Sequence, residues 1–153
     1  YDHGSNYGMG HLGILDHARL PKKRYYFYRE LYAGIPPPAW PVPGTPARLS
    51  LTTDRTEITD DGRSDAYLRV QVQDQNGQWL NQSPEITLTD LSGLGLFPTG
   101  KSITFTPGAM EGGVVEGLAA IEYRSYAPGT AVIEATAPGL PPTRISIKVR
   151  RAD

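Results

Sequence analysis

Hydrophobic and polar residues alternate along most of the chain after Arg48. The apolar members of the first two alternating segments are Leu49, Leu51, Ala66, Leu68, Val70 and Val72. Five further segments of this kind are separated by turn residues, at 85–90, 102–106, 118–125, 130–137 and 143–150. A period of two indicates strands with one buried face. About seven short strands in roughly a hundred residues, with no helix among them, predict a mainly β fold of the immunoglobulin-like β-sandwich class.

The sequence also predicts a hairpin turn and the core of this sandwich. Residues 74–77 form the turn after the second strand, because Asn76 and Gly77 tolerate positive φ. The chain has no Cys, so apolar packing alone must hold the two sheets together. The core candidates on the last two strands are Ala131, Ile133, Ala135, Ile145, Ile147 and Val149.

The pattern before residue 35 is different and predicts a helix over 22–33. Pro21 suits the first helical position, and Gly34 is a C-terminal stop signal. The apolar residues of this helix surround most of it instead of forming one stripe, and such a helix needs neighbours on most sides. They are Tyr25, Tyr26, Phe27, Tyr28, Leu31 and Tyr32. We therefore expect residues 1–34 to be the end of a larger domain, and the helix to dock on its own sandwich or form a homodimer.

Six prolines stand between the helix and the first strand, at positions 36, 37, 38, 41, 43 and 46. Proline removes backbone donors and favours an extended conformation, so residues 35–47 are predicted to be a stiff linker. The chain then divides into residues 1–34, the linker at 35–47 and a sandwich at 48–153.

Two stretches carry a resemblance to a known family. In YGMGHLGILDHARLPKKRYYFYR, a Gly-Ile-X-Asp turn, a basic residue and Pro-Lys precede a helix that begins with paired aromatics. The positions are Gly13, Ile14, Asp16, Arg19, Pro21, Lys22, Tyr25 and Tyr26. This order resembles the end of the catalytic (β/α)8 barrel in glycoside hydrolase family 2, the family of β-galactosidases. GLAAIEYRSYAPGTAVIEATAPGL, at 117–140, resembles the immunoglobulin-like domain that follows the barrel in many members.

The resemblance implies that this chain is a C-terminal fragment of such an enzyme. The parent would hydrolyse O-glycosidic bonds with two glutamates on earlier barrel strands, so this chain alone would be inactive and its main partner would be the rest of the barrel. Residues 1–34 would be the remnant of the barrel, with Asp2, His3 and Tyr7 at the rim of the parent's substrate site. An ordinary Gly-rich loop is the alternative for these three residues. The resemblance alone favours a secreted or periplasmic location, and the sequence does not define one.

The acidic residues do not supply a catalytic pair of their own. Glycosidases need two opposed carboxyl groups, one protonated and one ionised. Glu122 and Glu134 fall at the solvent-facing positions of strands, and most aspartates fall in turns. Asp16 and Arg19 are expected to form a buried tie between loop and barrel.

No metal site or cofactor is predicted. His3, His11 and His17 lie eight and six residues apart, which matches no helical ligand spacing. The segment DDGRSD at 60–65 lacks the spacing and closing Glu of a calcium loop, and Asx turns explain it better.

Exposed aromatic rings are the remaining candidates, because flat rings stack on sugars. Tyr67 and Trp79 are the best placed, and the alternative is that they cover the edges of the core. If both lay on one exposed face, a carbohydrate-binding module would be favoured. An invasin-type bacterial adhesion or spacer domain has a similar β pattern, but does not account for residues 1–34.

The amino-acid composition argues against several classes of function. The 15 basic and 16 acidic residues leave a formal charge of -1, which offers no electrostatic basis for binding nucleic acid or an anionic membrane. The absence of Cys excludes disulfides and thiolate catalysis.

Overall fold

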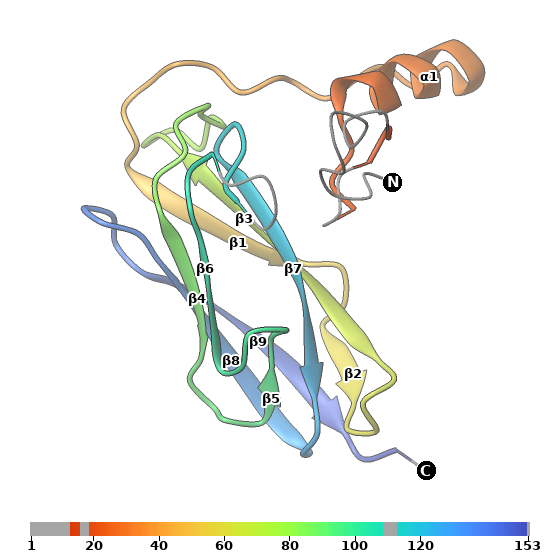
Figure 1. Cartoon of the computed structure of the whole chain (residues 1–153), viewed down its shortest axis with the longest axis vertical. Helices are drawn as coiled ribbons and strands as arrows, with labels where there is room; N and C mark the ends of the chain where they lie inside the picture. The colour runs from red at the N-terminus through yellow and green to blue at the C-terminus, as the bar shows by residue number, and fades with distance from the viewer. Residues whose placement is uncertain (1–12, 16–18, 109–112, 153) are drawn as a thin grey trace, which may run out of the picture.

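The computed structural model describes residues 13–15, 19–108 and 113–152, which form one helix followed by nine strands (Figure 1). The elements are α1 (Lys23–Ala33), β1 (Arg48–Thr53), β2 (Glu57–Thr59), β3 (Asp65–Gln73), β4 (Ile86–Asp90), β5 (Gly95–Leu96), β6 (Ser102–Phe105), β7 (Leu118–Ser125), β8 (Gly129–Thr136) and β9 (Thr143–Arg150). All seven predicted strands are confirmed. The two that the sequence missed, β2 and β5, have three and two residues, too few to show an alternating pattern.

The strands form two sheets that pack face to face. One has the order β1-β3-β7-β5 and the other β2-β9-β8-β4-β6. All pairings are antiparallel except that of β2 with β9. The predicted mainly β sandwich is therefore confirmed.

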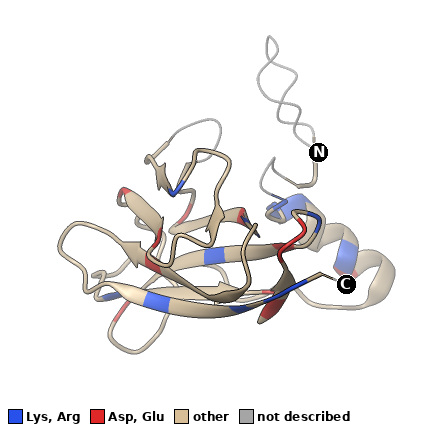
Figure 2. Cartoon of the chain, turned by 90° about the horizontal axis from the view of Figure 1, so that it is seen from below, with Lys and Arg blue, Asp and Glu red and all other residues tan. Residues whose placement is uncertain are grey.

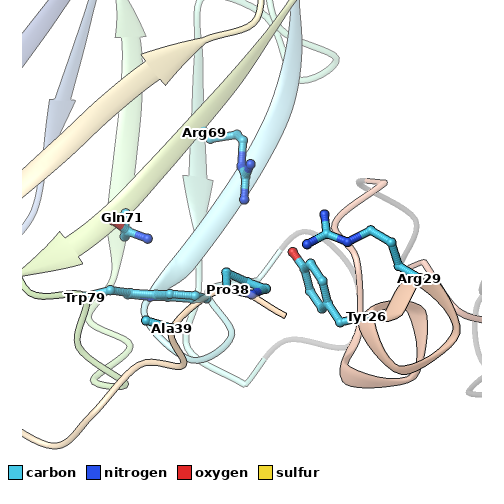
Figure 3. Close-up of a pocket in the computed structure, with 7 residues that line it drawn as sticks. All are labelled: Tyr26, Arg29, Pro38, Ala39, Arg69, Gln71 and Trp79. Carbon is cyan, nitrogen blue, oxygen red and sulfur yellow. The ribbon is translucent and has the colours of Figure 1, made fainter. Parts of the chain in front are cut away.

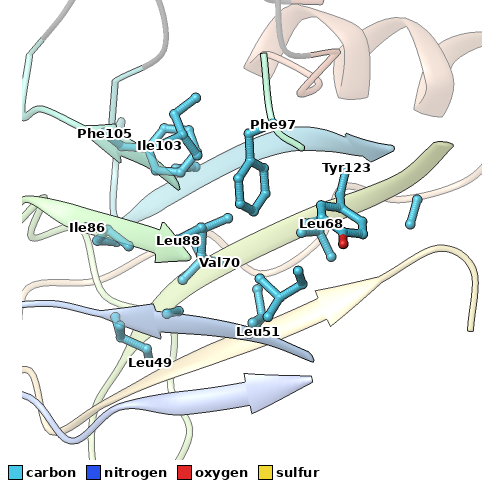
Figure 4. Packing of buried hydrophobic residues seen from close by; sticks show 14 of the residues in the cluster. Leu49, Leu51, Leu68, Val70, Ile86, Leu88, Phe97, Ile103, Phe105 and Tyr123 are labelled. Carbon is cyan, nitrogen blue, oxygen red and sulfur yellow. The ribbon is translucent and has the colours of Figure 1, made fainter. Parts of the chain in front are cut away.

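The core lies between the two sheets and is apolar (Figure 4). On β3, Ala66, Leu68, Val70 and Val72 are all fully buried, as the alternation predicted. Burying each large aliphatic side chain contributes about 1.5–3 kcal/mol. Five of the six core candidates on β8 and β9 are also buried, and Ile145 packs against the core while partly exposed.

The turn at 74–77 is present as predicted. Gly77 has a φ of 84°, and its N–H donates to the carbonyl of Asp74 at 3.2 Å. The carboxylate of Asp74 accepts the backbone N–H groups of Asn76 and Gln78, each at 2.8 Å. This turn returns the chain from β3 so that Trp79 lies opposite Gln73.

Helix α1 begins at Lys23, one residue later than predicted. The prediction that Pro21 occupies the first helical position is wrong. Lys22 is the N-cap with an extended backbone, so Pro21 lies before the helix. The reason is local pairing: Pro21 bridges to Leu15, and the Lys22 N–H donates to the carbonyl of Ile14 at 3.0 Å. Gly34 ends the helix as predicted, with a φ of 64° and its N–H bound to the carbonyl of Glu30.

The prolines of residues 35–47 exclude regular structure, and this segment is neither helix nor strand apart from one bridging residue. That residue, Val42, pairs with the sandwich: its N–H donates to the carbonyl of Trp79, and its carbonyl accepts the N–H of Asn81, both at 3.1 Å. The middle of the linker is thus held against the sandwich. No helix in the described part of the chain is long and apolar enough to cross a membrane.

Candidate functional site

Several carboxyl groups of the described residues serve as structural partners. Six of them form ion pairs with nearby bases: Asp54, Glu57, Asp65, Glu116, Glu122 and Glu134. Asp65 receives both arms of the Arg124 guanidinium, at 2.6 and 2.8 Å, and this hydrogen bonding lowers the pKa of the carboxyl. A glycosidase acid needs a raised pKa, so the shift at Asp65 is in the wrong direction.

One acid is buried. Desolvation raises the pKa of Asp90, but hydrogen bonds from Ser92, the Gly95 N–H and Tyr123 outweigh it and the net shift is downward. The Tyr123 hydroxyl donates to Asp90 Oδ2 at 2.9 Å, and burial, followed by this bond to a carboxylate, raises the pKa of the phenol. Asp90 ends β4 and Tyr123 lies on β7, so the pair connects the two sheets. It stabilises the fold and is closed to substrate.

The outer face of the β1-β3-β7-β5 sheet carries polar side chains, a small apolar contact and one wall of a pocket. Strand register places Tyr67 beside Glu122, Arg69 beside Ala120 and Gln71 beside Leu118 on this face. The segment before helix α1 covers part of it. Leu20 is buried there against Leu118 and Ala120, with Tyr67 and Trp79 packed at the edges.

Two ion pairs accompany this contact. Arg19 Nη2 lies 3.2 Å from Glu122 Oε1, and Lys23 Nζ lies 3.3 Å from Glu116 Oε1. The sequence predicted that Asp16 and Arg19 form a buried tie between the loop and the barrel. The predicted burial of Arg19 is wrong. The Arg19 side chain is 57% exposed, because a long arginine side chain can reach a partner on the sheet while its guanidinium stays in water. Asp16 lies outside the described residues.

A pocket of about 390 Å³ opens between helix α1, the linker and this sheet face (Figure 3). Its lining residues are Tyr26, Arg29, Pro38, Ala39, Arg69, Gln71 and Trp79. Among the described residues, two guanidiniums and one amide line it, and no carboxylate does. Figure 3 shows the Arg29 and Arg69 side chains reaching toward the same space above Tyr26 and Pro38.

Contacts around the pocket hold its aromatic walls. The Trp79 indole N–H donates to the carbonyl of Glu116 at 2.9 Å, which fixes the ring. Tyr26 meets Trp40 edge to face, with ring centroids 5.4 Å apart. The Arg29 guanidinium carbon lies 5.1 Å from the centroid of the Tyr26 ring, and Arg29 Nη2 donates to the carbonyl of Pro36.

The structure brings together only some of the residues singled out from the sequence. Asp2, His3, Tyr7, His11 and His17 lie outside the described residues. Tyr67 and Trp79 share a sheet face, but both rings are half-buried at the edge of the Leu20 cluster, so they do not form a flat exposed platform. In the described ranges no cluster of three His, Asp or Glu residues could hold a metal ion.

Sequence reasoning missed Arg29 and Arg69. The alternation of β3 did place Arg69 and Gln71 on the polar side of the strand. Nothing in the pattern showed that α1 would lie opposite them, because that depends on the path of the linker.

Comparison with known proteins identifies the fold. No protein-family model and no curated protein matches the sequence. Among solved structures, a β-glucuronidase from glycoside hydrolase family 2 is similar over 72% of this chain and 12% of its own, with 24% identity and a TM-score of 0.59. A family 2 glycosyl hydrolase from Bacteroides cellulosilyticus is similar over 71% of this chain and 15% of its own, with 19% identity and a TM-score of 0.58.

The same fold occurs outside the glycosidases. The D00-D0 domain of intimin is similar over 71% of this chain and 50% of its own, with 20% identity and a TM-score of 0.52. The sandwich therefore has the fold of a domain in glycoside hydrolase family 2 structures, and this chain spans only 12–15% of the length of the hydrolases it matches.

Proposed function

We propose that this chain is the non-catalytic C-terminal part of a family 2 glycoside hydrolase, with the sandwich as an accessory domain. The observation that carries the proposal is the match of the sandwich to one small portion of several such hydrolases. The motif from Gly13 to Tyr26, which resembles the end of the barrel, independently supports the same parent.

The packing of residues before α1 supports an accessory role. Leu20 is buried on the outer sheet face. The Arg19–Glu122 and Lys23–Glu116 ion pairs connect the chain before and after Leu20 to the sandwich. Exposed ion pairs contribute only about 0–1 kcal/mol each, so the apolar contact matters more and the pairs define its orientation. In the parent, this contact would set how the barrel end meets the sandwich.

The catalytic carboxylates would lie on the preceding barrel, as the resemblance implies. In this proposal, Asp2, His3 and Tyr7 border the parent's substrate site, and the sandwich takes no part in the chemistry. Within the described residues, the ion-paired acids and the enclosed Asp90 supply no opposed pair of carboxyls.

The test compares the 153-residue chain with the longer protein encoded by its gene. We expect the longer protein to cleave at least one nitrophenyl galactoside, glucuronide, mannoside or glucoside, and the 153-residue chain to cleave none. Substitution of the two upstream glutamates should abolish the activity. Turnover by the short chain that is lost on changing one of its own acids would contradict the proposal, as would the absence of a glutamate pair upstream.

An adhesion or spacer role of the invasin type is the second candidate, favoured by the match to intimin. The same experiment separates the two, because an adhesin would carry no glutamate pair upstream and would cleave no glycoside. A carbohydrate-binding module based on stacking by Tyr67 and Trp79 is less favoured, because both rings are half-buried.

A further inference from the structure

The pocket between α1 and the outer sheet face combines a cationic wall with aromatic walls. Arg29 comes from the helix, Arg69 and Gln71 from β3, and Trp79 from the segment after the hairpin turn (Figure 3). These residues are far apart in the chain and meet only in the folded protein. We propose that this pocket binds a hexuronate, a sugar ring that carries a carboxylate.

The charge of the pocket argues for an anionic ligand. Among the described residues, neither Arg29 nor Arg69 has a carboxylate partner, whereas Arg124 and Arg144 do. Arg29 Nε is buried and has no hydrogen-bond partner in the described part of the chain. A buried donor without a partner costs free energy, and the arginine side chains that line the pocket can pair with a carboxylate. The planar fork of a guanidinium matches the two oxygens of that group.

The remaining donors and the walls argue for a sugar ring. Gln71 Oε1 already accepts a hydrogen bond from Gln73 Nε2 at 2.9 Å, which leaves the Gln71 amide N–H groups available as donors. The Trp79 ring is held in place by its own bond to Glu116 and presents an apolar surface. A hydroxylated ring with one apolar face suits both features. The volume of about 390 Å³ lies within the range of small-molecule sites.

This site is separate from the proposed chemistry of the parent enzyme, and its test needs no hydrolase activity. The intact 153-residue chain is titrated with sodium glucuronate and sodium galacturonate, and the amide signals of Gln71 and Trp79 are followed by nuclear magnetic resonance. Glucose, acetate and phosphate are titrated in parallel. We expect saturable binding of a uronate that is at least tenfold tighter than binding of glucose, acetate or phosphate.

Arg69→Gln is the most direct variant, because the Arg69 side chain is exposed on β3 and its loss leaves the core unchanged. It should weaken uronate binding at least fivefold, and Arg69→Lys should weaken it less. Arg29→Gln should also weaken binding, although it removes the bond to Pro36 as well. Arg63→Gln is the matched control, an exposed arginine outside the pocket that should leave binding unchanged.

Several results would overturn the proposal. Binding of acetate or phosphate as tight as that of a uronate would show a general anion site, and equal binding of glucose would show that charge is not recognised. Equal losses in the Arg69→Gln and Arg63→Gln variants would place the ligand elsewhere. Absence of saturable uronate binding by the wild-type chain, with its β signal intact, would also refute it.

Discussion

At the residue scale, the contact between Asp90 and Tyr123 is a buried polar interaction that connects the two sheets. The carboxylate accepts hydrogen bonds from the backbone N–H groups of Ser92, Gly93 and Gly95 as well as from the tyrosine. It therefore organises the loop after β4 and connects this loop to β7. The Tyr123 ring also packs against Phe97, with centroids 5.4 Å apart.

Removal of the Tyr123 hydroxyl should destabilise the fold. We expect Tyr123→Phe to lower the free energy of unfolding by about 1.5–3 kcal/mol, because a hydrogen bond to a buried carboxylate is lost. Urea denaturation measures this. Tyr126→Phe, at an exposed position one residue after β7, is the control and should change stability by less than about 0.5 kcal/mol. Equal effects of the two substitutions would show that the connection contributes little.

Acid should destabilise the sandwich in part through Asp90. Its pKa in the folded protein lies below the ordinary value of 3.8, so the ionised carboxylate favours folding. As the pH falls through 3.8, the unfolded chain binds the proton first and stability decreases. We expect urea midpoints measured from about pH 6 to pH 2 to fall on acidification, and to fall less steeply in Tyr123→Phe, which lacks one of the bonds that lower this pKa. Parallel slopes would contradict this role.

Two glycines with similar backbone conformations should respond differently to Ala. Gly117 has a φ of 70°, and a Cβ there would lie 2.0 Å from the carbonyl oxygen of Leu80. Gly139 has a φ of 76°, but a Cβ there would meet nothing within 4 Å. Gly139→Ala should cost about 1–2 kcal/mol from its left-handed backbone alone. Gly117→Ala should cost about 2–5 kcal/mol, because a clash with backbone is added. Equal losses on urea denaturation would refute the steric argument.

At the element scale, α1 is unusual because none of its 11 residues is buried. Isolated helices of this length are marginal in water. Here the helix is supported at one end by the Lys23–Glu116 pair and the Tyr26–Trp40 contact, and it ends at Gly34. Its far face still exposes Phe27, Leu31 and Tyr32, by 61%, 60% and 81%.

This exposed face should promote self-association, since the predicted homodimer would bury it. We expect light scattering to show a dimer at high concentration, and Phe27→Ser with Tyr32→Ser to shift the chain toward monomer. Arg24→Ser is the control, on the same helix but polar. A wild-type chain that remains monomeric at every concentration, or a double variant that dimerises equally well, would contradict the prediction.

At the scale of the whole molecule, the described residues form a sandwich with its own core. The segment before α1 packs Leu20 on one sheet face, and α1 extends to one side of the sandwich (Figure 1). The positions of Lys, Arg, Asp and Glu are spread along the described ribbon instead of gathering on one side (Figure 2). This arrangement agrees with the balanced charge of the sequence.

The sandwich should therefore fold without residues 1–40. We expect this truncation to keep the far-ultraviolet β signal and a cooperative thermal transition, because the cluster between the sheets contains none of the deleted residues. A longer truncation, of residues 1–47, should be less stable because it also removes Val42 and its two hydrogen bonds to the segment after the hairpin. Loss of cooperative melting in the shorter truncation would show that the boundary is wrong.

Local pattern alone determined most of the sandwich. The alternation in β3 assigned Leu68 and Val70 to the core and Arg69 to the surface, because side chains in a strand alternate between two faces. Gly34 marked the end of α1 through its tolerance of positive φ. These properties depend on neighbours within a few residues, so they can be read from the sequence.

The three-dimensional packing decided what the sequence pattern could not. Arg19 pairs with Glu122 across more than a hundred residues, and the pocket joins Arg29 to Arg69 through the path of the linker. Leu20, which lies shortly before the helix, is buried against Leu118 and Ala120 on a sheet. Short strands such as β5 form only because β7 offers a pairing edge. Each of these features depends on contacts between segments that are distant in the sequence. The type and spacing of neighbouring residues do not reveal such contacts.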